Sequence, residues 1–452
     1  MNPFKPTLMI ICWLLLACQA TATQLKSQPM FGVMGQPDGS GVVVQRVLPR
    51  STAAQMGIEA NDVILSYNQE PVSTFAELVS LIAADQVGDD IHIEIRRDGH
   101  QKTLTGILLR RPREHHENHQ VLYDEVQSGD NRLRSIVYKP ADLKPGESRP
   151  ALYFIQGYTC QSIDYGMVPQ ATMQQLFNQV VDSGFVVYKL EKFGVGDSAG
   201  ALDCSQVNFT QELSGFKAGL KALKAYDFVT ADEVFLFGHS LGGVYAPLIG
   251  EGQQFKGIAV YGAVLKSWYD YLQDMFTVQA VMMGTAEDTA QANGQLIQPL
   301  LQAWLNTNSD WQDIRSDPRF QEAFAANLLP HQGDQVFQRH YGFFRDLNAY
   351  DLSVAWRKVA SPVLVMHGAF DIQTISDDWA RNLTELLNTE EDDQATLRIF
   401  DNTDHGLMTY PTFQALRQAM NEGSYNPGQP GEHYNHEVAT ALISWMEDVL
   451  EP

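Results

Sequence analysis

The chain has 452 residues, of which 44% are hydrophobic, with 34 glycines and 20 prolines, a composition typical of ordinary globular proteins. Its length predicts two or three structural units of roughly 100–200 residues each. The formal net charge of −23 would repel the phosphate backbone of nucleic acid, and no dense run of Lys and Arg offsets it. Nucleic acid is therefore excluded as an expected partner, and an anionic membrane surface is disfavoured for the same reason.

The first 22 residues have the layout of a secretory signal peptide. Lys5 precedes the apolar run 8–17, and small residues follow, ending in Ala20-Thr21-Ala22. The run is too short to span a bilayer. A second interpretation stays open, because Leu15-Leu16-Ala17-Cys18 resembles a bacterial lipobox, in which Cys18 would carry a lipid. We expect a periplasmic or secreted protein that is attached to a membrane only if Cys18 is lipidated.

Residues 30–111 predict a small unit of short strands and one helix. The expected strands are 41–47, 62–67 and 91–95, and the last alternates apolar and polar residues as a half-buried strand does. Between them, the spacing of Leu78, Val79 and Ile82 predicts one apolar stripe on a helix over 74–84.

The pattern of this unit resembles a bacterial PDZ domain. The resemblance is carried by the segment from Val47 to Gly57, followed by Asn61-Asp62-Val63-Ile64. It implies that the C-terminus of a protein adds as a strand beside a groove. Backbone N–H groups of the loop Met30-Phe31-Gly32-Val33 would hold the carboxylate of that C-terminus. A PDZ-shaped unit that binds nothing is the alternative, because fold does not fix function.

Residues 112–119 form a polar linker that contains the cluster His115-His116-Glu117-Asn118-His119. Clustered histidines are potential metal ligands, but no Cys or carboxylate follows at a spacing that zinc sites use. A solvated tether is the simpler interpretation. We expect no metal and no organic cofactor in this protein.

From residue 120 to 452, apolar strands alternate with helical patterns, which predicts an α/β fold with a mainly parallel sheet covered on both faces. The expected strands are 133–138, 151–155, 185–190, 234–237, 257–261, 363–366 and 396–400, and the expected helices are 172–182, 207–225 and 438–449. About 100 residues before the strand at 363 show no strand pattern, which is far longer than an ordinary connection. They are rich in aromatic residues, and we expect a helical cap over about 264–355.

A nucleophile motif joins one of these strands to a helix. Gly238-His239-Ser240-Leu241-Gly242 follows an apolar strand, and the two glycines suit a turn too tight for side chains beside the serine. A serine hydroxyl needs a base oriented by an acid, and N–H donors where the oxyanion forms. Ser240 is the predicted nucleophile, and His239 is expected to pack against the sheet.

The predicted base and acid follow two later strands. Asp371 comes after the strand at 363 and His405 after the strand at 396, in the chain order that this motif requires. Both lie at strand C-termini, where parallel sheets assemble their sites. We assign His405 as general base and Asp371 as the carboxylate that fixes its tautomer. Asp377 and Asp378 are rival acids, whereas Asp404 is adjacent to His405 and badly placed to reach its ring.

These features resemble the α/β-hydrolase superfamily over about 120–452, closest to its capped esterases and its serine aminopeptidase-like branch. The resemblance implies an oxyanion hole made by the backbone N–H groups of Leu241 and of Tyr158. The family usually shows His-Gly before the second donor, where this chain has Gln156-Gly157. His367 precedes the acid loop and is expected to support it.

Two cysteines, Cys160 and Cys204, remain once the signal peptide is excluded. Export to an oxidising compartment makes them a disulfide candidate, with two buried thiols as the alternative. Both follow neighbouring expected strands. The glycine-rich segment 194–200 looks like the family's loop after the fourth strand, which would bring Cys204 near Cys160.

The predicted function is hydrolysis of a carboxylic ester through an acyl-Ser240 intermediate, with the aromatic cap forming an apolar pocket. A serine peptidase or aminopeptidase is the first alternative. An aminopeptidase needs acids in the cap to hold the substrate ammonium, and Asp270, Asp274, Glu287 and Asp288 occur there. A PDZ-based binding protein with an inactive hydrolase body is the second alternative. The expected partners are a small ester or peptide substrate and, at the PDZ-like unit, a protein C-terminus.

Overall fold

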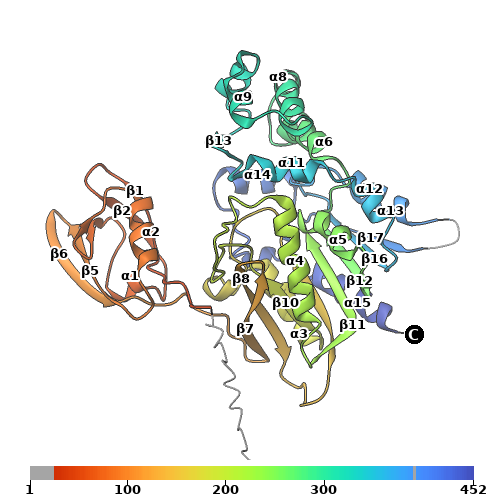
Figure 1. Ribbon diagram of the computed structural model, residues 1–452, viewed down its shortest axis with the longest axis horizontal. Helices are drawn as coiled ribbons and strands as arrows, with labels where there is room; N and C mark the ends of the chain where they lie inside the picture. The colour runs from red at the N-terminus through yellow and green to blue at the C-terminus, as the bar shows by residue number, and fades with distance from the viewer. Residues whose placement is uncertain (1–24, 390–392, 452) are drawn as a thin grey trace, which may run out of the picture.

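The computed structural model describes residues 25–389 and 393–451. It consists of a small N-terminal unit, a body built on a large central sheet, and a helical cap above the body (Figure 1). The expected signal peptide and Cys18 lie outside the described residues. In the described part of the chain, no helix is long and apolar enough to cross a membrane.

The N-terminal unit is an antiparallel sheet with two helices. Its strands are β1 (Val33–Pro37), β2 (Val42–Val47), β3 (Val63–Tyr67), β4 (Glu70–Pro71), β5 (Asp90–Arg97) and β6 (His100–Ile107), and its helices are α1 (Thr52–Gln55) and α2 (Phe75–Ala84). The order β1-β2-β3-β5-β6 leaves β1 at an edge, and α2 contacts β1. A capping box between Thr74 and Glu77 starts α2.

One detail of α2 differs from the sequence prediction. Leu78 is 1% exposed and packs in the core, but Val79 is 48% exposed. The apolar stripe therefore does not include Val79, because that position has turned away from the core. Met34 on the edge strand β1 is also half exposed, so β1 and α2 each present an apolar side chain to solvent.

The body is an eight-stranded sheet in the order β17-β16-β12-β11-β9-β10-β8-β7. Its strands are β7 (His119–Ser128), β8 (Asn131–Pro140), β9 (Arg149–Ile155), β10 (Val186–Leu190), β11 (Val229–His239), β12 (Gly257–Tyr261), β16 (Val363–Gly368) and β17 (Ala395–Phe400). The six strands β17, β16, β12, β11, β9 and β10 pair in parallel with their neighbours in this order. β8 pairs antiparallel with β7 and β10. β7 was not predicted, because this edge strand carries polar residues that obscure its alternation.

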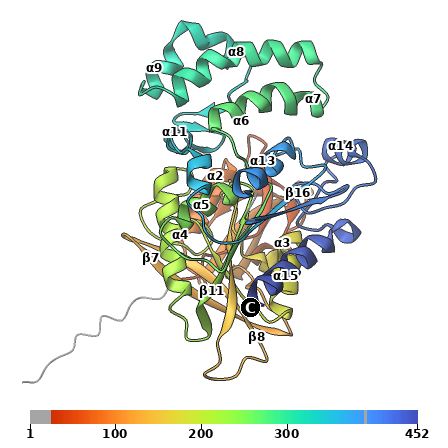
Figure 2. The same cartoon turned by 90° about the vertical axis from the view of Figure 1, so that its right-hand side faces the viewer.

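Helices cover both faces of the sheet, as predicted. On one face lie α3 (Thr172–Asp182) and α15 (His436–Leu450), whose apolar side chains share a core with the sheet. On the other lie α4 (Phe209–Leu223), α5 (Gly242–Gly250) and α13 (Asp378–Leu387). Parallel strands buried on both faces bring all their C-termini to one edge, which is the edge that the cap overlies (Figure 2).

The cap is helical, with a small sheet that the sequence did not predict. Its helices are α6 (Trp268–Asp274), α7 (Ala280–Met282), α8 (Glu287–Leu305), α9 (Trp311–Ser316), α10 (Gln321–Ala325) and α11 (Tyr341–Asn348). Three two-residue strands, β13 (His331–Gln332), β14 (Gln335–Val336) and β15 (Arg339–His340), correct the expectation of a strandless segment. They were missed because two residues are too few to show a period. Buried Trp304, Trp311 and Phe344 fill the cap core.

The linker is more deeply packed than a solvated tether. Glu114 is buried and accepts a 2.7 Å hydrogen bond from the ammonium group of Lys189 on β10. His119, the first residue of β7, is also buried. Arg50 of the N-terminal unit donates to the carbonyl of Gly166 in the body at 2.9 Å. The charged residues of the linker led to the prediction of a solvated tether. A buried ion pair cannot be recognised from the linker sequence, because the partner lies elsewhere in the chain.

Candidate active site

The Ser240 elbow is a strained turn between β11 and α5. Ser240 has φ +57°, a left-handed conformation that non-glycine residues rarely adopt. A Cβ on Gly238 would lie 2.4 Å from the carbonyl oxygen of Gly242, and a Cβ on Gly242 would lie 2.1 Å from that of Ile155. Both positions therefore require glycine. The N–H of Ser240 donates to Tyr261 O at 2.9 Å, which ties the turn to the neighbouring strand β12.

His405 and Asp371 are in direct contact. The Nδ1 atom of His405 lies 2.7 Å from Oδ2 of Asp371. The other carboxylate oxygen accepts hydrogen bonds from the N–H groups of Gln373 and Thr374, each at 2.9 Å. The acid is thereby held in one orientation, with Oδ2 turned toward the imidazole.

The rival acids have other partners. Asp377 pairs with Arg381 at 2.8 Å, and Asp378 accepts from the hydroxyl of Ser376 at 2.8 Å. The carboxylate of Asp404 accepts from the N–H of Met408 at 2.8 Å. The geometry therefore places Asp371, rather than these acids, against the ring of His405.

Burial and mutual attraction set the protonation of this pair. Burial alone would raise the pKa of Asp371, but the charge and hydrogen bond of His405 outweigh it and hold the pKa below its usual range. For His405, burial lowers the pKa, but Asp371 outweighs it and the net shift is upward. A carboxylate that stays ionised beside an imidazole made more basic is the arrangement that a general base requires.

His239 has a role that the sequence did not reveal. Its Nε2 lies 2.9 Å from the backbone carbonyl of His405, and its ring stacks on Tyr261. Burial, reinforced by His405, lowers the pKa of His239 to about 3, so the ring is neutral and donates to that carbonyl. His239 thus anchors the His405 loop to the elbow. His367 is buried beside Thr374 in the acid loop, at 3.5 Å from its hydroxyl.

Two backbone N–H groups lie free beside Ser240. Within the described residues, neither the N–H of Leu241 nor that of Tyr158 donates a hydrogen bond to another protein atom. A Cβ on Gly157 would lie 3.0 Å from Cβ of Ser240 and 3.4 Å from its Oγ, so this loop presses against the serine. Leu241 also precedes α5, whose N-terminus favours negative charge. These are the donors that the sequence assigned to an oxyanion hole.

A buried charged cluster supports the Gly157–Tyr158 loop from behind. The ammonium of Lys192 donates to Gly157 O at 2.6 Å, and Arg339 donates to Tyr158 O at 3.1 Å. Glu212 on α4 neutralises both cations, at 2.9 Å from Lys192 and 2.6 Å from Arg339. All three side chains are at most 1% exposed. Sequence patterns did not predict this cluster, because its members come from a loop, a helix and the cap.

A disulfide joins this region to the loop after β10. Cys160 and Cys204, 44 residues apart, are bonded with their Cα atoms 5.8 Å apart. The pairing agrees with the sequence expectation. Because Cys160 lies two residues after Tyr158, the bond limits the movement of the loop that carries the Tyr158 N–H.

A cavity of about 1060 Å³ opens over these groups and is lined by Ser240, Leu241, Tyr158 and His405. Its cap side is mostly apolar and aromatic. Its apolar part is formed by Trp268, Tyr271, Leu272, Met275, Phe337 and Phe344, and His331, Gln332, Gln335 and Gln338 add polar groups to it. Trp268 and Phe344 stack with ring centroids 5.6 Å apart. The site therefore combines polar groups at the edge of the sheet with a mostly apolar surface that the cap contributes.

The fold and this arrangement define an α/β-hydrolase with an N-terminal PDZ domain. A model of PDZ domains matches residues 29–107. The model described as serine aminopeptidase, S33, matches residues 169–411, more than half of the chain. The chain belongs to this serine aminopeptidase family of α/β-hydrolases.

Two curated relatives are similar to this chain over short segments. The chain is 29% identical over 110 residues to a probable periplasmic serine endoprotease DegP-like of Marinomonas sp. (strain MWYL1), covering 24% of this chain and 22% of that protein. It is 44% identical over 61 residues to the periplasmic serine endoprotease DegP of Escherichia coli (strain K12), covering 14% and 13%. The matches thus span less than a quarter of the length of either relative.

Among solved structures, the chain is similar to Est1E from Butyrivibrio proteoclasticus with ferulic acid bound. The TM-score is 0.41 at 15% identity, covering 66% of this chain and 97% of that one. The esterase domain of a Rhodothermus marinus protein gives 0.42 at 15% identity, covering 73% and 98%.

Proposed function

We propose that this protein is a carboxylesterase that works through an acyl-Ser240 intermediate. The observation that carries the proposal is the cavity over Ser240 and His405, whose cap side is mostly apolar and aromatic. Such a surface suits an acyl chain or an aromatic acid, because burying apolar area supplies the binding energy.

In this mechanism Ser240 Oγ attacks the ester carbonyl while His405 takes its proton through the ring nitrogen opposite Asp371. The N–H groups of Leu241 and Tyr158 stabilise the oxyanion. The protonated imidazole, stabilised by Asp371, then gives its proton to the leaving alcohol. Water repeats the sequence on the acyl-enzyme and releases the acid.

The acids of the cap argue against an aminopeptidase. Asp274 pairs with Lys266, and Asp270 accepts from the hydroxyl of Ser267. Glu287 and Asp288 lie exposed in the first turn of α8. Among the described residues, none of these four lines the cavity. The carboxylates that do line it, Asp164 and Asp404, belong to the body.

Those two body carboxylates are poorly suited to hold an ammonium group. Both are buried, and burial raises the pKa of each above its usual value. A raised pKa favours the neutral acid, which attracts a cation less than a carboxylate does. The cavity therefore favours an uncharged acyl group over a charged N-terminus.

The proposal is tested by comparing p-nitrophenyl esters of increasing acyl length with aminoacyl p-nitroanilides. We expect turnover of esters, abolished in Ser240→Ala with the fold retained by circular dichroism. Turnover of anilides without turnover of esters would instead establish the peptidase alternative. A fluorophosphonate probe separates both from a binding protein with an inactive body, because only an activated serine reacts. Failure of native protein to label, while a control hydrolase labels, would overturn the enzyme proposal.

We further propose that the PDZ domain binds protein C-termini and that the protein is exported. The half-exposed Met34 and Val79 on β1 and α2 support the first, since an added strand would bury them. The disulfide and the periplasmic relatives support the second. The carboxylate would sit at the loop Met30-Phe31-Gly32-Val33, where Gly32 has φ +85° and a Cβ would lie 2.1 Å from Cβ of Ser51. Peptide binding that survives Gly32→Ala would contradict this placement.

A further inference from the structure

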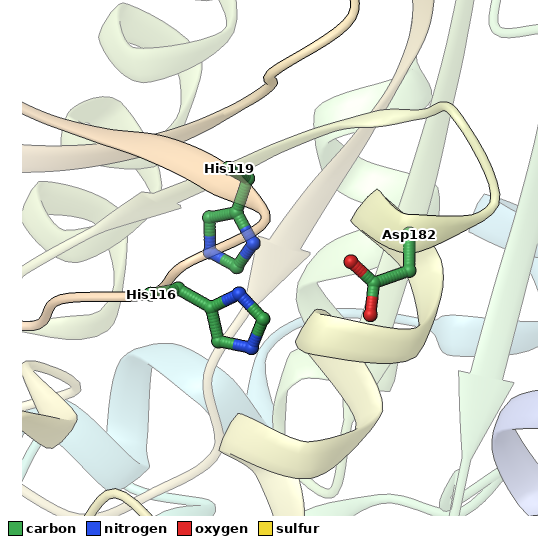
Figure 3. A group of neighbouring side chains, drawn as sticks. All are labelled: His116, His119 and Asp182. Atoms are coloured by element: carbon green, nitrogen blue, oxygen red, sulfur yellow. The ribbon is translucent and has the colours of Figure 1, made fainter.

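Three potential metal ligands from two parts of the chain, the linker with the start of β7 and the end of α3, meet at the C-terminal end of α3. His116 belongs to the linker, His119 begins β7 and Asp182 ends α3, and their ligand atoms lie within 4.8 Å of one another. Figure 3 shows the two imidazole rings one above the other, with the carboxylate of Asp182 beside them. The sequence argued against a metal because no carboxylate had a suitable spacing. The fold brings one from α3.

The ring of His119 is buried, and its hydrogen-bonding capacity is unused by the residues that the structure describes. It is 4% exposed, and within the described residues neither of its ring nitrogens forms a hydrogen bond. Its two faces are covered by the rings of His116 and Tyr138, with centroids 4.2 and 4.7 Å away. A buried polar group left unpaired destabilises the protein, and a bound ion would relieve that cost. Burial also favours the neutral imidazole, which is the form that binds metals.

The charges around His119 favour a cation. Asp182 is the last residue of α3, where the helix dipole is already negative, so its carboxylate is stabilised by a positive ion nearby. The ammonium group of Lys189 also acts on His119, but it is paired with Glu114 at 2.7 Å. The positive charge of Lys189 is therefore already neutralised by a buried acid.

We propose that His116, His119 and Asp182 bind one Zn²⁺ ion, with water completing the coordination. Two imidazoles and a carboxylate form a donor set that zinc uses. Bonds of 2.0–2.1 Å in tetrahedral geometry place donors about 3.3 Å apart, so the ligand atoms must approach one another by at most about 1.5 Å. His119 is fixed in the sheet. His116 is partly exposed and Asp182 is exposed, so these two side chains move.

Binding requires the ring of His116 to tilt out of its stack on His119, because stacked rings direct their lone pairs side by side rather than at one point. In tilting, His116 gives up the 3.2 Å hydrogen bond that its Nδ1 accepts from the N–H of Asn118. That bond lies at the surface, where water replaces it at little cost.

The ion would stabilise the fold and would take no part in the reaction. Thr172 and Met173, at the start of α3, line the active-site cavity, whereas Asp182 ends the helix about 15 Å away. Zinc there would fasten the linker to β7 and α3. It would thus fix the segment that joins the PDZ domain to the hydrolase body.

The test is titration of the protein with Zn²⁺ in competition with a chromophoric chelator. We expect one equivalent to bind, with a rise in unfolding temperature. His116→Ala and Asp182→Asn should each weaken binding by at least about tenfold, because loss of even an outer-shell partner costs that much. Both replace side chains at the surface, so the fold should be retained. His115→Ala is the matched control, since His115 is exposed on the same linker and should leave binding unchanged.

A second measurement follows the linker itself. Zinc should slow tryptic cleavage within 110–119 in the native protein and in His115→Ala, but not in Asp182→Asn. The proposal is overturned if native protein binds no zinc, if the control loses as much affinity as His116→Ala, or if Asp182→Asn is protected as well as native protein.

Discussion

The ammonium group of Lys192 donates a 2.6 Å hydrogen bond to the carbonyl oxygen of Gly157. That carbonyl belongs to the same peptide unit as the N–H of Tyr158, and in a trans peptide the two groups point in opposite directions. A cation behind the carbonyl therefore orients the N–H toward Ser240 and strengthens its dipole. Lys192 acts as a positioning residue for the proposed oxyanion hole.

Replacing Lys192 by Met should lower kcat by about 10- to 100-fold with a small change in KM, because one donor in an oxyanion hole contributes up to 10²–10³. The readout is steady-state kinetics on a p-nitrophenyl ester. Lys221→Met, on the exposed face of α4, is the control for loss of one positive charge. If the two variants have the same kcat, Lys192 has no influence on the site.

The pKa of Lys192 also predicts a fall in kcat at alkaline pH. Burial, partly offset by Glu212, lowers the pKa of Lys192 to about 8. As the pH rises through that value the ammonium loses its charge, so kcat of the native protein should fall above about pH 8. Lys192→Met has no such group and should show a flat profile there, measured over pH 7–9.5. An unchanged alkaline limb in Lys192→Met would assign it to another residue.

Asp371→Asn should lower kcat by roughly 10²–10⁴-fold, the contribution of a general base held in the correct tautomer. It should also move the acid limb of kcat/KM. The base must be neutral, so activity is lost as the pH falls through the pKa of His405. Because Asp371 raises that pKa, its removal should shift the limb to lower pH. Asp377→Asn, which breaks the pair with Arg381 outside the contact between Asp371 and His405, should keep the native profile. If Asp377→Asn lowered kcat more than Asp371→Asn, the acid of the site would be Asp377.

Loss of the disulfide should destabilise the protein and loosen the active site. Replacing both Cys160 and Cys204 by Ser removes a cross-link that closes a loop of 44 residues, with an expected loss of about 2–4 kcal/mol in the free energy of unfolding. Since Cys160 follows Tyr158 closely, kcat should fall as well. Denaturant unfolding and ester kinetics measure the two effects. Equal free energies of unfolding for the native and double-mutant proteins would show that the disulfide does not stabilise the fold.

Trp268→Ala should change the acyl preference. Trp268 lines the cavity and stacks on buried Phe344. Removing its indole ring therefore enlarges the cap side of the cavity. The ratio of kcat/KM for long over short p-nitrophenyl esters should rise about tenfold, since each added buried methylene contributes about 0.8 kcal/mol. Val281→Ala, exposed elsewhere on the cap, should leave the ratio unchanged. An unchanged ratio in Trp268→Ala would place the acyl chain away from Trp268.

Much of the body could be predicted from the sequence because its strands are buried on both faces and appear as apolar runs. Expected strand 257–261 coincides with β12, and expected helix 172–182 coincides with α3. The polar edge strand β7 was missed, because exposure removes the apolar pattern. Contact between Asp371 and His405 followed from their positions after adjacent parallel strands, β16 and β17.

Other parts of the site depend on contacts that no local pattern encodes. Lys192, Glu212 and Arg339 are charged residues that ordinarily lie at the surface, and only the fold shows that they neutralise one another inside the protein. The same holds for Asp182, whose position beside the linker histidines depends on how α3 crosses the sheet.

Arg339 gives the cap a part in the architecture of the body. It lies in β15, yet it binds the carbonyl of Tyr158 and the carboxylate of Glu212. A chimaera that exchanged the cap for that of a relative without this arginine would leave Glu212 with one cation instead of two. It would leave the carbonyl of Tyr158 with only the 3.4 Å hydrogen bond from Lys192. Substrate range in this protein therefore cannot be engineered by transplanting lids unless the transplanted segment brings an arginine to the same position.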